Sequence, residues 1–461
     1  YEEYLYRQVE DGKGNAPRAM PDLLIEPADH QGRQDNRPLF RPQFGNWQRR
    51  AKVPVLVVNA TSLNTGHNWQ FSATRMGEPT RRLGGYVDKN AYYPPVPYKE
   101  APSDDLQRFR LGHAVASSSC VPGLFEPLAI SKLYKESTVQ LVDGGVHDNQ
   151  GSQGLLANDC TVLLCSDASG QMDDNLNPSD SLLGVLSRTS DIQADRIREA
   201  EYQDLKSCLE HGAMRGFFFV HLKKDLQPHV LDWKKETVPN LSQPDTPTQY
   251  GIAADLQQRL AEIRTDLDSF TEVEAYSLMC SGYLMTRQHL QWLREEDPKQ
   301  TGFWKHYQMD TPSGAWPFLA LEPLLGTTVA KGGAQRAKLD RQLEVGKDLF
   351  LKAWQLVPAL KWLGIALLIL AGLGIIYSIG QVWTKDIGIT WGHLWVTLLL
   401  AAAGFAFPVV RMLSPEQLKR SFALRIVVAT LGWVAANFHL LFIDRIFITQ
   451  GKLDRLLEKK K

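Results

Sequence analysis

The chain has 461 residues, which is enough for two or three domains, and its 51 basic side chains equal its 51 acidic ones in number. This balance excludes an argument from overall charge for nucleic-acid binding. The five cysteines form no Cys-x-x-Cys pair and no Cys/His metal-ligand spacing, so the sequence predicts no metal site and no disulfide, and their odd number suits free thiols in a reducing compartment.

The front part of the chain predicts a layered α/β domain. Residues 1–52 are polar, rich in Arg, Asn, Gln and Pro, and predict a connector with little core. Buried strands are predicted where β-branched and apolar residues run together, at 53–59, 139–142, 161–165 and 216–222. Helical patterns lie between or beside them, at 107–120, 154–157 and 181–206. Strands that alternate with helices predict a mainly parallel sheet with flanking helices.

Polar side chains follow three of the predicted strands. Asn59 ends the first strand, Asp143 follows the second, and Asp167 follows the third. In parallel sheets the carboxyl ends of the strands open onto loops that carry binding and catalytic groups. We therefore expect a functional site at these strand ends.

Residues 226–340 predict a mostly helical extension. A proline-rich loop at 224–250 leads into a helical pattern at 253–290, and Gly332 and Gly333 predict a linker to the next part.

The last part of the chain, 341–461, predicts a membrane domain. Nearly uncharged runs with the length of bilayer-spanning helices lie near 362–382, 387–410 and, less regularly, 426–443. Lys and Arg gather in the stretch 411–425, so the positive-inside rule places this stretch, and with it the front part, in the cytoplasm. The sequence thus predicts an integral membrane protein. The polar groups His393, Asn437 and His439 at membrane depth leave a transporter component open as another class.

The most informative motif is the segment 141–149, which reads Leu-Val-Asp-Gly-Gly-Val-His-Asp-Asn. A carboxylate at the end of a buried strand, followed by two glycines, fixes Asp143 where the strand opens onto a site. On its own, a turn without function is the simpler interpretation of Asp-Gly-Gly. The segment resembles, however, the Asp-Gly-Gly/Ala motif of patatin-like phospholipases. Further segments similar to bacterial members of that family follow the family's order, at 59–66, 113–127, 165–170 and 270–283.

The resemblance implies that 53–225 is the C-terminal part of a patatin-like catalytic domain. In that family a Ser nucleophile and an Asp form a catalytic dyad; Asp143 would be this Asp, and Gly144, Gly145 and Asn149 would form the supporting loop. The implied function is a membrane-anchored lipid acyl hydrolase of the phospholipase or lipase type. It would act in the bacterial cell membrane on membrane lipids, without a cofactor.

The chain contains no Gly-x-Ser-x-Gly turn, the usual setting of the nucleophile. We therefore expect the nucleophilic serine in an N-terminal part of the protein that precedes Tyr1, and we expect the chain alone to be inactive. A catalytically inactive lipid-binding or regulatory protein of the same family is the alternative.

Other side chains are weaker catalytic candidates. Ser117, Ser118 and Ser119 lie in a small-residue helix without the glycines of a nucleophile elbow, which favours helix packing. His147 and His113 suggest a Ser-His-Asp arrangement, but the resembling family uses no His. Asp167 stands before Ser169 and Gly170, a pattern typical of a turn.

Overall fold

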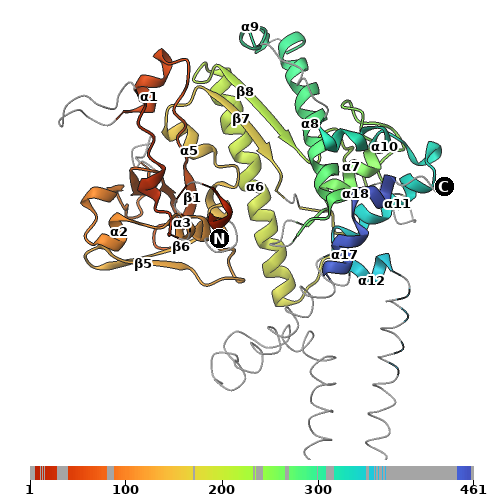
Figure 1. The fold of residues 1–461 in the computed structure, drawn as a ribbon, viewed down its shortest axis with the longest axis horizontal. Helices are drawn as coiled ribbons and strands as arrows, with labels where there is room; N and C mark the ends of the chain where they lie inside the picture. Colours follow the sequence, from red (N-terminus) through yellow and green to blue (C-terminus); the bar gives the residue numbers. More distant parts are fainter. Residues whose placement is uncertain are drawn as a thin grey trace, which may run out of the picture. The chain divides into compact units, whose positions relative to one another are not determined.

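The computed structural model describes residues 6–348 with short gaps, and then 352–357, a few single positions up to 369, and 444–457 (Figure 1). The longest gaps within the first range are 29–39, 80–87, 235–241, 265–268 and 308–315. The chain forms two compact units, 1–221 with 289–309, and 222–288 with 310–461.

A six-stranded antiparallel sheet forms the centre of the first unit. Its strands in chain order are β1 (Val58–Ser62), β2 (Asn68–Phe71), β3 (Arg75–Gly77), β4 (Val96–Pro97), β5 (Leu128–Tyr134) and β6 (Ser137–Asp143). Their order across the sheet is β4-β3-β2-β1-β6-β5, and each neighbouring pair is antiparallel. The prediction of a patatin-like, mainly parallel sheet is therefore wrong.

Short connections explain the antiparallel pairing of the strands that follow one another closely in the chain. Residues 63–67 join β1 to β2, with Gly66 at a φ of 78°, and residues 135–136 join β5 to β6. A parallel return needs a crossover of roughly a dozen residues or more, so connections this short can only reverse the chain. The predicted strand at 53–59 begins only at Val58, whereas the predicted strand at 139–142 lies inside β6.

Parallel pairing is present in a separate two-stranded sheet, β7 (Val162–Asp167) and β8 (Gly216–His221). The long helix α6 (Leu182–Glu210) lies between these strands in the sequence, and the hydroxyl of Ser181 caps its first turn by accepting the Gly184 N–H at 3.2 Å. Leu163, Leu205, Met214 and Phe217 form the buried core of this pair.

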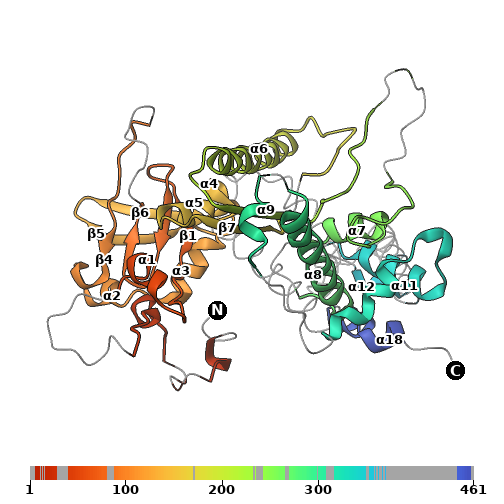
Figure 2. The ribbon, with the colours of Figure 1, turned by 90° about the horizontal axis from the view of Figure 1, so that it is seen from above.

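The core of the six-stranded sheet is aromatic and aliphatic. Trp69, Phe71 and Leu141 are fully buried, and Phe71 stacks on Phe109 at a centroid distance of 5.2 Å. The helix α3 (Leu111–Ser118) packs against β1 and β6 (Figure 2). Met20, within the predicted connector at 1–52, also belongs to this core.

Shorter helices complete the first unit, namely α1 (Pro42–Gly45), α2 (Asp104–Gln107), α4 (Gly145–Asp148), α5 (Ser152–Ala157) and α9 (Thr301–Trp304). The second unit holds α7 (Ala254–Ala261), α10 (Glu322–Leu325), α11 (Ala334–Val345), α12 (Lys352–Leu356), α17 (Asp444–Gln450) and α18 (Leu453–Leu457). Helix α8 (Glu272–Glu295) belongs to the second unit up to Gln288 and to the first unit from His289.

A buried ion pair ties together three segments of the second unit. Arg264 Nη1 donates to Glu274 Oε1 at 2.6 Å, and both side chains are almost completely buried. Arg264 also donates to the carbonyl oxygen of Gly346 at 2.9 Å, and Glu274 Oε2 accepts the Thr271 N–H at 2.7 Å. Each charged group in this cluster therefore has hydrogen-bond partners, which offsets the cost of burying it.

The described part of the chain includes no helix that is both long enough and apolar enough to cross a bilayer. Its two longest helices, α6 and α8, carry charged residues along their length. The prediction of an integral membrane protein is corrected by this finding. Apart from single positions such as Trp362, the predicted spans near 362–382, 387–410 and 426–443 lie outside the described residues.

Candidate functional site

Asp143 lies at the end of β6, next to the central strand β1. It pairs with Ala60 across the two strands, and its carbonyl oxygen accepts the Thr61 hydroxyl at 2.9 Å. Its own N–H donates to the carbonyl oxygen of Cys120 at 2.9 Å, in the segment that follows α3. Strand β1 and the segment after α3 thus both hold the backbone of Asp143 in place.

Of the two glycines after Asp143, Gly144 is required by a close backbone contact, and Gly145 lies close to two side-chain oxygens. A Cβ atom at Gly144 would lie 2.7 Å from the carbonyl oxygen of Asn59, and one at Gly145 would lie 2.6 Å from Asn149 Oδ1. The same Cβ at Gly145 would lie 3.1 Å from Asp143 Oδ1. The structure therefore brings the four residues of the predicted site, Asp143, Gly144, Gly145 and Asn149, into one tight loop, which continues into α4.

The Asp143 carboxylate is half-buried and has one hydrogen bond. The N–H of Gly145 donates to its Oδ1 at 2.7 Å, and its Oδ2 has no hydrogen-bond partner among the residues that the structure describes. Burial raises the pKa of Asp143 above its ordinary value, although the bond from Gly145 opposes this shift. The group is therefore a stronger base than a solvated aspartate, with one oxygen available to accept a proton.

The predicted serine candidates do not bond to this carboxylate. The Ser117 hydroxyl donates to the carbonyl oxygen of Ala114 at 2.8 Å, and the Ser119 hydroxyl donates to that of Val115 at 3.1 Å. The carbonyl oxygen of Ser118 accepts the Gly144 N–H at 3.3 Å. Within the described residues, Asp143 thus has no serine hydroxyl as a hydrogen-bond partner.

Cys120 is a further potential nucleophile close to Asp143. It was not among the catalytic candidates predicted from the sequence. Its Sγ donates to the carbonyl oxygen of Glu126 at 3.0 Å. Burial, and then the charge of Asp143, raise the pKa of Cys120. A thiol held protonated in this way is a poor nucleophile, so we interpret Cys120 as a packing residue.

The histidine candidates also lie apart from the Asp143 carboxylate. His147 lies in α4, its Nδ1 is buried without a hydrogen-bond partner in the described structure, and burial lowers its pKa. His113 is exposed on α3, where its ring meets Phe109 edge-on at 5.8 Å. Neither ring forms a hydrogen bond with Asp143, so the described geometry contains no Ser-His-Asp arrangement.

Asp167, at the end of β7, belongs to a buried polar cluster rather than to the Asp143 loop. Its Oδ1 accepts the Ser169 N–H at 3.1 Å, as expected for a turn. Its Oδ2 lies 3.4 Å from Arg198 Nη1 and 3.5 Å from Gln150 Nε2. Helix α6 supplies the arginine of this cluster, and this contact could not be predicted because Arg198 and Asp167 are far apart in the chain.

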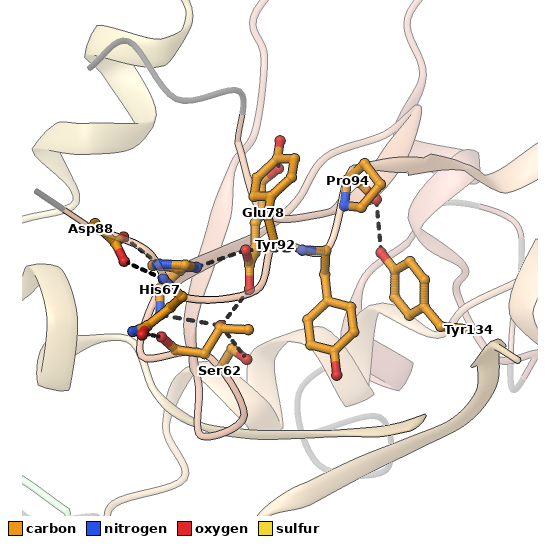
Figure 3. Close-up of polar contacts among 10 residues, drawn as sticks. Ser62, His67, Glu78, Asp88, Tyr92, Pro94 and Tyr134 are labelled. Carbon is orange, nitrogen blue, oxygen red and sulfur yellow. Dashed lines mark hydrogen bonds and ion pairs between the residues drawn. The ribbon is translucent and has the colours of Figure 1, made fainter. Parts of the chain in front are cut away.

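A second polar cluster surrounds His67 in the turn between β1 and β2 (Figure 3). His67 Nδ1 lies 2.9 Å from Glu78 Oε2, and His67 Nε2 lies 2.6 Å from Asp88 Oδ2. Glu78 Oε2 also accepts the Tyr93 N–H at 3.1 Å, and Glu78 Oε1 hydrogen-bonds the Thr65 hydroxyl. Because Glu78 is only 1% exposed, we infer that this cluster stabilises the turn and is not a substrate site.

Within the described part of the chain, no three His, Cys, Asp or Glu side chains come together in an arrangement that could hold a metal ion. Comparison of the chain with protein-family models, with curated proteins and with solved structures found no match. The resemblance to patatin-like phospholipases therefore has no support from these comparisons, and the antiparallel sheet contradicts the fold that it implied.

Proposed function

We propose that the Asp143 loop is the proton-accepting half of a site that cleaves acyl esters, with lipid acyl esters as the substrate class. The observation that carries this proposal is the state of the Asp143 carboxylate, which is half-buried, held by one backbone N–H, and has one oxygen without a partner in the described structure. A carboxylate fixed at a strand end by two close-packed glycines is suited to general-base chemistry.

In the proposed reaction, Asp143 accepts the proton of a serine hydroxyl while the serine oxygen attacks the ester carbonyl carbon. The tetrahedral intermediate then expels the alcohol, which takes the proton back from Asp143. In the second half, Asp143 accepts a proton from water while the water oxygen attacks the carbonyl carbon of the acyl-serine. The tetrahedral intermediate then breaks the bond to the serine oxygen, which takes the proton back from Asp143, and the carboxylic acid is released. The nucleophile in this proposal lies outside the described residues.

A binding protein without catalysis is the second candidate. It is favoured by the absence, within the described residues, of any serine hydroxyl that hydrogen-bonds to Asp143. Binding of an acyl ester without its cleavage, by protein expressed from the complete coding sequence, would support this candidate over the enzyme.

The acidic limb of the pH profile tests the proposed base. Asp143 can accept a proton only when it is ionised, and its pKa is raised above the ordinary value of 3.8. For protein expressed from the complete coding sequence, we therefore expect kcat/KM for p-nitrophenyl acyl esters to fall with decreasing pH, beginning at a higher pH than for a solvated aspartate. Circular dichroism at each pH checks that the fold persists. A rate that stays constant down to about pH 4 would exclude Asp143 as the base.

A further inference from the structure

The last two described helices, α17 and α18, pack against other helices of the second unit (Figure 1). Helix α17 contacts α12, and α18 contacts α11. Helix α12 ends at Leu356 and α17 begins at Asp444, and most residues between them lie outside the described part of the chain. After this long stretch, the chain thus returns to the part of the second unit that it left.

Phe447, on α17, is the centre of this contact. Its side chain is 1% exposed and forms a buried cluster with Val345 and Ala353, which belong to α11 and α12. Lys352 Nζ lies 4.6 Å from the centre of the Phe447 ring, and Arg264 Cζ lies 5.5 Å from it. A cation over the face of an aromatic ring is attracted by the ring electrons. Phe447 is therefore held both by apolar packing and by two cations.

The turn between α17 and α18 exchanges hydrogen bonds with the start of α8. The carbonyl oxygen of Gly451 accepts the Val273 N–H at 3.0 Å, and Glu272 Oε2 accepts the Leu453 N–H at 2.9 Å. Val273 is the second residue of α8 and Leu453 is the first residue of α18. The first N–H groups of a helix have no acceptor within that helix. Each of these two helices thus gains a partner for one such N–H from the other segment.

The carbonyl groups at the ends of α17 and α18 have donors on α11. The last carbonyl groups of a helix likewise lack partners within that helix. Three side chains at helical spacing on one face of α11 donate to such groups, namely Gln335, Lys338 and Gln342. Their acceptors, in the same order, are the carbonyl oxygens of Leu457, Arg455 and Gln450. One face of α11 therefore matches the ends of both short helices.

We propose that α11, α12 and the start of α8 form a docking surface that binds the segment 444–457 as a separable partner, without the covalent connection through 358–443. A buried aromatic anchor surrounded by polar contacts is typical of specific interfaces, and Phe447 and the bonds around it have this arrangement. The bonds to the helix ends add specificity, because they require two short helices that end at fixed places. This docking holds the two ends of the stretch 358–443 together, and it does not depend on the proposed ester cleavage.

Cleavage of the connection tests the docking surface. Protease recognition sequences are inserted into the full chain near positions 370 and 435, outside the described residues, and a fluorophore is attached to the C-terminus. After cleavage, we expect the short fragment that carries 444–457 to co-elute with the front part of the chain in size-exclusion chromatography. In Phe447→Ala the fragment should be released at least about 100-fold faster after dilution, because loss of a buried aromatic side chain removes much of the binding energy. Fluorescence anisotropy measures this release.

Arg445→Ala is the matched control, because Arg445 lies on α17 but is exposed. The fragment with this substitution should be released at the wild-type rate. A wild-type fragment that elutes apart from the front part of the chain would overturn the docking surface, and so would release of the Phe447→Ala fragment at the wild-type rate. If Phe447→Ala does not fold before cleavage, Gln342→Ala takes its place. Loss of its hydrogen bond to Gln450 should speed release about 5-fold, and an unchanged rate would count against the proposal.

Discussion

Asp143→Asn is expected to lower kcat for acyl-ester cleavage by about 100- to 10,000-fold, the range typical for loss of a general base. Asparagine has nearly the volume of aspartate, and its side-chain oxygen can still accept the Gly145 N–H that holds the native carboxylate. The fold and the ester-binding surface should therefore persist, and KM should change little. Steady-state kinetics with p-nitrophenyl acyl esters, on protein expressed from the complete coding sequence, measure both parameters.

Asp105→Asn is the control for this substitution, because Asp105 is an exposed aspartate on α2. The same chemical change at this position should leave kcat at the wild-type value. If both variants kept wild-type kcat, Asp143 would have no catalytic role, and the proposal of an ester-cleaving site at this loop would be withdrawn.

Glu274→Ala is expected to lower the free energy of unfolding by about 3–5 kcal/mol, the cost typical for removing one partner of a buried ion pair. The substitution leaves the Arg264 guanidinium buried without its carboxylate, and Thr271 loses the acceptor for its N–H. Urea unfolding followed by circular dichroism measures this loss.

An exposed pair in the same unit provides the comparison. Arg259 Nη2 lies 3.3 Å from Glu344 Oε1, and the Glu344 side chain is 47% exposed. Glu344→Ala should cost less than about 1 kcal/mol, because water screens this pair. Equal losses in the two variants would mean that the burial of the Arg264–Glu274 pair does not set its contribution to stability.

The local features around Asp143 could be predicted from the sequence. A β-branched run ending in Asp-Gly-Gly indicates a strand followed by a tight turn, and β6 ends at Asp143 as expected. The end of this strand depends on neighbouring residues alone, and a single sequence contains that information. The glycines were expected to permit tight turning of the backbone, but Gly144 has an ordinary helical φ of −61°, and its close contact is with the carbonyl oxygen of Asn59, a residue far away in the chain.

Strand direction and buried polar partners could not be predicted in the same way. The strands β3 and β4 are very short, and β4 contains Pro97, so neither gives a clear strand pattern. Without them, the strands β1 and β6 looked like members of a parallel α/β sheet. Glu78 resembles a surface acid in the sequence, because its partner His67 lies in the turn between two other strands.

Covalent labelling with a fluorophosphonate tests most directly whether Asp143 activates a serine nucleophile. In protein expressed from the complete coding sequence, we expect the wild type and Asp105→Asn to react at the same rate with one equivalent of the reagent. Asp143→Asn should react at least about 100-fold more slowly, because its serine keeps the proton. Equal labelling of Asp143→Asn and the wild type, or no labelling of the wild type, would contradict the proposed function.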